Sequence, residues 1–293
     1  MHIRAYLYLT ITTAFWAGNA VMGKFAVGHI SPLTLSLFRW SLAFIVILAI
    51  SLPQLKADWP QIRKAWPLML AYGVLGFALF NAFLYSALQY TSAINCAIEQ
   101  GGIPGIIFIA NYLLFRTKVS LAQIIGFSLT LAGVAVTASH GSLSSLMRLE
   151  FNFGDGLMML AVLSYAIYTV ALRYKPQVHW KTQMAVPALG ALMACIPLAF
   201  FEWRQGAMIL PDHIGWAAVI FTAIFPSLIS QVLFVRGVEL IGPNRAGLFI
   251  NAVPVFGTLL SIVTLGESFH LFHLAAMALV LFGIAIAEKG RGL

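Results

Sequence analysis

Polar and aromatic side chains recur at helical spacing within stretches of this sequence that are otherwise apolar. Asn81 and Tyr85, for example, are four residues apart, and residues three or four apart lie on one face of an α-helix. Such faces offer hydrogen bonds to the backbone groups of an amino acid and rings to an apolar or aromatic side chain. We therefore predict a central substrate-binding cavity lined by Trp16, Asn19, Asn81, Tyr85, Gln100, Tyr165, Tyr168, Gln231 and Asn251. The alternative is that these side chains join helices through hydrogen bonds.

Glu99 is the acidic residue that lies clearly within an apolar stretch. Ionisable groups in membrane helices are costly, and most are paired or functional. One hypothesis is that Glu99 carries a coupling proton. The other is that it is a structural acid paired with Lys24 or Arg39, since all three are expected toward the same end of the molecule.

Glycine and proline predict helix bends at Gly101, Pro104, Gly105 and Pro254. Proline removes an intrahelical hydrogen bond, and glycine lets neighbouring backbones approach closely. A paired bend in two halves of the chain would suit the rocking movement of a transporter. The alternative is that these residues are ordinary ones for membrane helices, which often contain glycine and proline.

Several kinds of chemistry lack support in the sequence. There is no HExxH, GxSxG or GxxxxGK[ST] motif, and the two cysteines form no CxxC pair. We expect no catalytic residues, no metal site and no cofactor, so the energy for any transport must come from a gradient or from substrate exchange.

Composition decides the class of protein. Hydrophobic residues make up 61% of the 293-residue chain and charged residues 9%, against about 25% charged in soluble domains. The chain is therefore predicted to be an all-α polytopic protein whose partners are the lipid bilayer and a small-molecule substrate. The net charge of +8 is better explained by basic loops on one membrane face than by nucleic acid. We expect a monomer.

Apolar runs of about 20 residues predict ten transmembrane helices. Their predicted bounds are Tyr6–Val27, Leu33–Leu52, Trp66–Leu88, Ala93–Phe115, Leu121–Ser139, Gly156–Tyr174, Thr182–Phe201, Ile214–Val238, Ala246–Leu265 and Leu271–Ala287. With the N-terminus in the cytoplasm, most of the 17 Lys and Arg residues lie on the inner side, and Lys24, Arg148 and Arg204 lie on the outer side. The positive-inside rule therefore predicts that both termini are cytoplasmic, in a bacterial inner membrane.

The chain also repeats itself weakly. Asn81–Thr137 aligns without a gap to Gln231–Ala287, and apolar runs and breaks coincide. Because five spans are an odd number, the second copy must enter the membrane from the opposite side, as in many secondary transporters. We predict two inverted five-helix repeats around a central cavity, at 1–139 and 156–293, joined by an extracytoplasmic linker at 140–155.

An ordered set of motifs resembles the EamA family of the drug/metabolite transporter superfamily, most closely its bacterial aromatic amino-acid exporter branch. The motifs are Trp16-Ala17-Gly18-Asn19 with Lys24, Gly154-Asp155-Gly156, the Pro104 and Pro254 pair, and Leu265-Gly266-Glu267. The first half departs from the pattern, with Arg116-Thr117 where Gly-Glu is expected. The resemblance implies inverted repeats around a substrate cavity and export of metabolites or amino acids by alternating access. We predict export of aromatic and other neutral amino acids.

Other functions stay open from the sequence. The cargo could be a drug or another metabolite of the same superfamily, and a cationic drug would need a carboxylate in the cavity, for which Glu99 is the candidate. The chain could also be an uncoupled facilitator or channel, or a subunit without transport activity.

Overall fold

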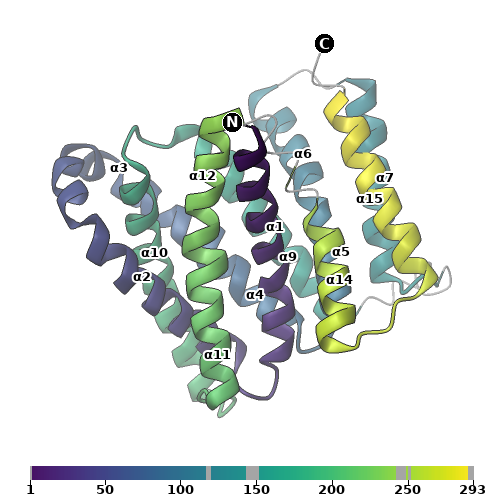
Figure 1. Cartoon of the computed structure of the whole chain (residues 1–293), viewed down its shortest axis with the longest axis horizontal. Coiled ribbons are helices and arrows are strands. Elements are labelled where there is room, and N and C mark those ends of the chain that lie inside the picture. The colour runs from purple at the N-terminus through teal and green to yellow at the C-terminus, as the bar shows by residue number, and fades with distance from the viewer. Residues whose placement is uncertain (1, 117–119, 143–151, 242–248, 250–251, 290–293) are drawn as a thin grey trace.

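The structure, a computed structural model, describes residues 2–116, 120–142, 152–241, 249 and 252–289, and the regular elements in these ranges are helical (Figure 1). In chain order they are α1 (His2–Phe25), α2 (Pro32–Ala57), α3 (Trp59–Tyr72), η1 (Gly73–Leu79), α4 (Phe80–Ala87), α5 (Ala93–Glu99), η2 (Gln100–Gly102), α6 (Ile103–Phe115), α7 (Leu121–Ala138), α9 (Phe153–Ala171), η3 (Leu172–Tyr174), α10 (Trp180–Arg204), α11 (His213–Thr222), η4 (Ala223–Ile229), α12 (Ser230–Ile241), α14 (Val253–Leu265) and α15 (Leu271–Lys289). The segments η1 and η4 are π-helical, and η2 and η3 are 3-10 helices.

Local hydrogen bonds explain several of these boundaries. The Ser92 hydroxyl accepts a bond of 3.0 Å from the backbone N–H of Asn95 at the start of α5. Ser120 and Gln123 form a reciprocal capping box at the start of α7. Such caps satisfy N–H groups that have no partner within the helix. Helix α6 is followed by Arg116 and helix α14 by Gly266. Both of these C-cap residues have a left-handed backbone conformation.

Element boundaries in the first half recur 150 residues later in the second. The two π-helical segments are the most telling pair, because π-helical turns are rare. Each follows a run of α-helix and leads directly into another α-helix. The matched starting residues are Gly73 and Ala223, Phe80 and Ser230, Ile103 and Val253, and Leu121 and Leu271.

Helices α2 and α10 pack against each other, and a carboxylate from α10 accepts hydrogen bonds from the first turn of α2. Glu202, near the end of α10, accepts hydrogen bonds from the backbone N–H groups of Leu33 (3.1 Å) and Thr34 (2.9 Å). It also accepts bonds from the hydroxyls of Ser31 (2.6 Å) and Thr34 (2.7 Å). The first N–H groups of a helix have no partner within the helix and attract negative charge. The buried carboxylate of Glu202 is therefore stabilised at this position.

A second carboxylate makes the reciprocal contact. Asp58, at the end of α2, accepts hydrogen bonds from the Thr182 hydroxyl (2.6 Å) and the backbone N–H of His179 (3.0 Å) at the start of α10. Desolvation opposes ionisation of Asp58, but the hydrogen bonds outweigh it and lower the pKa of this carboxyl below its ordinary value. Because each helix start meets the other helix end, α2 and α10 run antiparallel.

Helices α7 and α15 form a second close antiparallel pair (Figure 1). A methyl group added at Gly126 would lie 2.3 Å from the carbonyl oxygen of Gly283, and one added at Gly133 would lie 2.7 Å from that of Ala276. The earlier residue of α7 thus meets the later residue of α15. Glycine allows this backbone approach, as in many membrane helix pairs.

We expect Gly126→Ala to lower the thermal stability of the purified protein. Overpacking generally costs about 1–3 kcal/mol, and here the new methyl group meets rigid backbone. The measurement is the unfolding midpoint in detergent. Gly156→Ala in α9 is the control, because a methyl group there meets nothing within 4 Å, and alanine is about 1 kcal/mol better than glycine within a helix. Equal midpoints for the two variants would contradict the expectation.

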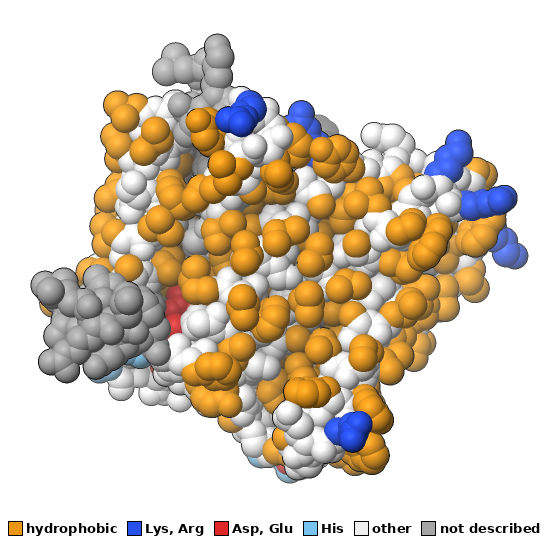
Figure 2. All heavy atoms as spheres, turned by 180° about the vertical axis from the view of Figure 1, so that it is seen from behind, with side chains coloured by type: hydrophobic (Ala, Val, Ile, Leu, Met, Phe, Trp, Pro, Cys, Tyr) orange, Lys and Arg blue, Asp and Glu red, His pale blue; other side chains and the backbone are white. Residues whose placement is uncertain are grey.

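The surface of the molecule is that of a membrane protein. Among the described residues, six helices are long and apolar enough to cross a bilayer, and α7, α14 and α15 provide shorter apolar segments. Figure 2 shows hydrophobic side chains over most of one face. Most of the visible Lys and Arg side chains lie toward the upper edge, at the end of the molecule where α1 begins and α15 ends (Figures 1 and 2).

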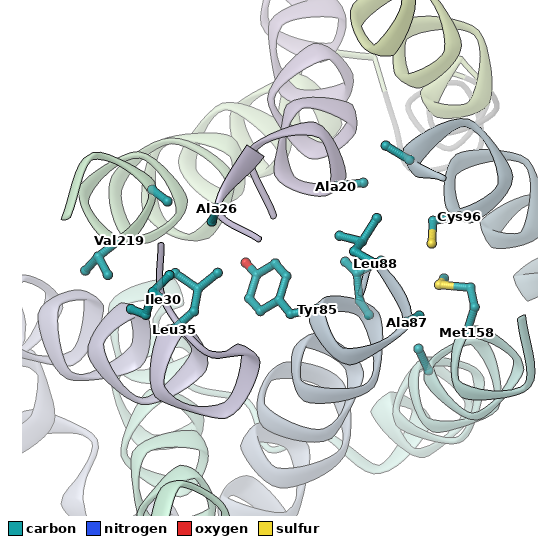
Figure 3. Packing of buried hydrophobic residues seen from close by; sticks show 14 of the residues in the cluster. Ala20, Ala26, Ile30, Leu35, Tyr85, Ala87, Leu88, Cys96, Met158 and Val219 are labelled. Atoms are coloured by element: carbon teal, nitrogen blue, oxygen red, sulfur yellow. The ribbon is translucent and has the colours of Figure 1, made fainter. Parts of the chain in front are cut away.

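Inside, buried hydrophobic side chains join helices of the two halves (Figure 3). This cluster includes Tyr85 of α4, Leu88 directly after it, Cys96 of α5, Met158 of α9 and Val219 of α11. The ring of Tyr85 belongs to this cluster, while its hydroxyl points away from Leu88 (Figure 3) and bonds Arg39 and Asn19 in a polar site.

Candidate functional site

A buried arginine lies at the centre of this polar site. Arg39, on α2, is only 4% exposed. Its Nε donates a hydrogen bond of 2.9 Å to the Ser227 hydroxyl. Its Nη1 donates bonds of 2.7 Å to the side-chain oxygens of both Asn19 and Asn81, and also bonds to the Tyr85 hydroxyl. We call these five residues the Arg39 cluster.

Four separate segments supply the Arg39 cluster, namely α1, α2, α4 and η4. Its members also bond one another, since the Tyr85 hydroxyl donates to the Asn19 oxygen at 2.8 Å. The π-helical segments support the cluster from both halves. Asn81 donates to the carbonyl oxygen of Phe77 in η1 (2.6 Å), and Ser227 lies within η4. Irregular helical turns of this kind are frequent at functional sites.

The charge of the Arg39 cluster is unbalanced. Within the part of the chain that the structure describes, every hydrogen-bond partner of Arg39 is a neutral side chain. Those bonds use Nε and Nη1, and none uses Nη2. The indole N–H of the neighbouring Trp40 is buried and lacks a hydrogen-bond partner among the described residues. A buried cation without a counter-charge is costly, so the site is suited to a carboxylate.

A series of aromatic rings leads away from Arg39. The guanidinium lies 5.2 Å from the Trp40 ring centre, and Trp40 stacks on Phe77 at 4.7 Å. Phe77 is 5.8 Å from Tyr168, which is 5.4 Å from Tyr165. Ring separations of 4.5–7 Å are typical of favourable aromatic contacts. The structure therefore connects two predicted site residues, Tyr165 and Tyr168, to the arginine.

Comparison with known proteins gives the family. A family model described as the EamA-like transporter family matches the chain twice, at residues 3–139 and 152–288. The chain belongs to the EamA-like transporter family. Its two matched segments correspond to the two halves whose element boundaries recur.

Relatives of this EamA-like chain are described as transporters. The uncharacterized transporter YyaM of Bacillus subtilis is 25% identical, over 98% of this chain and 94% of its own length. The uncharacterized transporter YetK of the same species is 26% identical, over 96% and 86%. One solved crystal structure matches all of both chains at a TM-score of 0.68 and 20% identity, which shows a shared fold. The family and these names indicate a membrane transporter rather than an enzyme.

The remaining predicted site residues of this EamA-like chain are not members of the Arg39 cluster. Trp16 donates its indole N–H to the carbonyl oxygen of Pro226 in η4 at 3.3 Å. Gln100 is half-buried and donates to the carbonyl oxygen of Cys96 at 3.1 Å. Gln231 is half-buried at the start of α12. Asn251 lies outside the described residues.

The predicted bend positions fall where helices begin or meet neighbours. The 3-10 segment η2 interrupts the span between α5 and α6 and includes Gly101. Pro104 and Pro254 lie in the first turns of α6 and α14, where proline fits because its missing N–H would have no partner. A methyl group added at Gly105 would lie 2.3 Å from the ring of Phe127.

Neither ion pair expected for Glu99 is formed among the described contacts. Lys24 donates to the carbonyl oxygens of Leu88 and Thr91, each at 2.8 Å, and Arg39 bonds the neutral side chains above. Glu99 is fully buried, and both of its carboxylate oxygens lack a hydrogen-bond partner in the described part of the chain.

Two members of the Arg39 cluster were not among the predicted binding residues. Arg39 was expected only as a structural partner for Glu99, and Ser227 was not predicted. The sequence does carry a signal for Arg39, because it is a cation in the middle of an apolar run. Ionisable residues within membrane spans are usually functional.

Proposed function

We propose that this protein is a secondary transporter that exports amino acids, mainly aromatic and other neutral ones, across the bacterial inner membrane by alternating access. One observation carries the proposal. The Arg39 cluster presents a buried guanidinium, held by neutral groups, beside a series of aromatic rings. A carboxylate would balance the charge, and the rings would contact an aromatic side chain.

The arrangement of helices supports alternating access. The equivalent helices α2 and α10 run antiparallel, and so do α7 and α15. We infer that the two halves are inverted repeats of five spans each, with ten spans in all, and that the Arg39 cluster lies where they meet. Inverted repeats can exchange conformations around a fixed substrate site. The basic end of the molecule would face the cytoplasm, with both termini.

The test is counterflow in proteoliposomes of the purified chain. Vesicles loaded with unlabelled phenylalanine should take up labelled phenylalanine faster than empty vesicles, without any ion gradient. Loading with lysine should give less stimulation, because a second cation would oppose Arg39. A well-folded sample with no counterflow of phenylalanine, tryptophan or threonine would refute amino-acid transport. Uptake without stimulation by loading would indicate a channel.

Among the residues that the structure describes, no acid is a hydrogen-bond partner of Arg39, which favours a second candidate class, aromatic carboxylic acids without an amino group. Competition separates the two classes. We expect 3-phenylpropionate to inhibit phenylalanine counterflow more strongly than 2-phenylethylamine does, because the first keeps the carboxylate. Stronger inhibition by the amine would contradict a carboxylate at Arg39. Transport of labelled 3-phenylpropionate itself would favour the second class.

A further inference from the structure

A groove with a volume of about 220 Å³ lies between two pairs of packed helices. Helix α10 packs on α2, and helix α12 packs on α1. The groove is lined by residues of α2, α10, η4 and α12, on the side of the molecule away from α7 and α15 (Figure 1). All of the lining side chains are hydrophobic. The groove is therefore suited to an apolar ligand.

This groove has a buried floor and an exposed rim. Ile47 and Met184, which line the floor, are buried in the hydrophobic core. Val46 and Ile50, which line the rim, are 38% and 51% exposed. Both rim residues belong to α2, a helix apolar and long enough to cross the bilayer, so the rim faces lipid rather than water. The apolar ligand that meets this opening in a membrane is the hydrocarbon chain of a lipid.

A cation lies at one end of the groove. Trp180 lines the groove and is the first residue of α10, and Lys181 follows it directly. The Lys181 ammonium lies 5.9 Å from the Trp180 ring centre and donates a hydrogen bond of 3.2 Å to the carbonyl oxygen of Ile50. Because Ile50 and Trp180 both line the groove, the ammonium lies beside it. Tryptophan is typical of the level at which lipid headgroups lie, and the long lysine stem lets its charge reach that level.

Lys181 is able to bind an anionic group. An ammonium has three donors, and among the described residues this one bonds only the Ile50 carbonyl oxygen. No carboxylate in the described part of the chain lies within ion-pair distance of it. The acid at this corner, Asp58, is instead bound by the Thr182 hydroxyl and the backbone N–H of His179. Several Lys and Arg side chains gather where α2 ends and α3 begins (Figures 1 and 2), and such a basic corner attracts anionic lipids.

We propose that the groove holds one acyl chain of an anionic phospholipid and that Lys181 binds the phosphate of its headgroup. The lipid belongs to the leaflet on the basic side of the molecule, where α2 ends and α10 begins. The bound chain fills the space between the α2–α10 pair and the α1–α12 pair, and it stabilises their arrangement by burying apolar surface. An aromatic substrate fits the groove less well, because the hydrophobic lining contains no group for its carboxylate and does not include Arg39. The proposal does not depend on which substrate is transported.

The first experiment tests the headgroup site with the purified full-length protein in a neutral detergent. Native mass spectrometry gives the Kd of the first bound dioleoylphosphatidylglycerol and of the first bound dioleoylphosphatidylcholine, which carry the same chains. The anionic lipid should bind at least about fivefold more tightly, since one lysine near an anionic headgroup contributes about that factor. Lys181→Gln should remove this preference. Lys175→Gln, which removes the same charge at an exposed position before α10, should keep it. Equal binding of the two lipids by the wild type, or equal effects of the two variants, would overturn the proposal.

The second experiment tests the acyl-chain site. In the double variant Val46→Trp/Ile50→Trp, two indole rings occupy the groove from its rim. Binding of the first phosphatidylglycerol should weaken at least about tenfold, because each buried methylene group contributes about fourfold to affinity. Leu160→Trp/Leu163→Trp is the control, since it makes the same change at two exposed positions of α9.

Thermal stability gives an independent readout of the same site. A ligand that binds the folded protein raises its stability, so phosphatidylglycerol should raise the unfolding midpoint of the wild type and of the α9 control. The groove variant should show less than half of that rise, and Ile50→Trp alone provides the test if the double variant is not monodisperse. A monodisperse groove variant that binds the lipid as tightly as the control, with the same rise in midpoint, would overturn the proposal.

Discussion

Replacing Arg39 by glutamine is expected to reduce phenylalanine counterflow by at least about 100-fold, because hydrogen bonds to charged groups contribute about 1.5–3 kcal/mol each. Glutamine keeps a polar side chain but removes the positive charge and the forked donors. Arg39→Lys should also fail, since an ammonium group cannot bond Ser227, Asn19 and Asn81 in the same geometry. The measurement is initial uptake at equal pH in proteoliposomes.

The control for Arg39 is Arg63→Gln on α3, where the side chain is exposed. It should transport like the wild type. Size-exclusion profiles of all variants show whether each one is folded. In any counterflow that remains, Arg39→Gln should lose the preference for 3-phenylpropionate over 2-phenylethylamine as inhibitor. Normal counterflow in a monodisperse Arg39→Gln protein would eliminate Arg39 as the carboxylate site.

The largest effect on stability is expected from Glu202→Ala. The variant leaves the N–H groups of Leu33 and Thr34 and two hydroxyls without their acceptor. Each buried donor left unpaired costs about 1–3 kcal/mol, so we expect a loss of at least about 3 kcal/mol. At roughly 2 °C for each kcal/mol, the unfolding midpoint should fall by about 6 °C or more.

Two variants test the reason for that loss. Glu202→Gln should lie between the wild type and Glu202→Ala, because the amide keeps one acceptor oxygen. Asp212→Asn changes an exposed cap at the start of α11, where asparagine also caps well, and should move stability by about 0.5 kcal/mol or less. A midpoint for Glu202→Ala equal to that of Asp212→Asn would show that the buried cap contributes little.

Much of the helical framework was predictable because apolar length and turn chemistry are local properties. The run Ala93–Phe115 was predicted with the same ends that α5 and α6 have together, and the predicted Leu121–Ser139 differs from α7 by one residue. The predicted start at Trp66 was wrong for the helix, which begins at Trp59. Charged residues such as Arg63 end an apolar run without ending a helix. Hydropathy therefore locates the membrane span but not the charged helical turns that precede it.

The site was predicted in part for a related reason. Polar residues in apolar runs pointed to Asn19, Asn81 and Tyr85, which the fold brings together. Ser227 was missed. It lies within the π-helical segment η4, where the rotation between residues differs from that of an α-helix, so α-helical spacing is no guide to its direction.

The contact between Glu202 and the start of α2 also sets an order of events during synthesis. Thr34 and its acceptor are 168 residues apart in the chain. At about 5–20 residues per second, a ribosome needs roughly 10–30 s to reach Glu202 after Thr34 has been made. During that interval the first turn of α2 must be hydrated, lipid-bound or held by the insertion machinery. The N-terminal half is therefore an incomplete folding unit. Its helix α2 gains the Glu202 acceptor only after the C-terminal half has been synthesised.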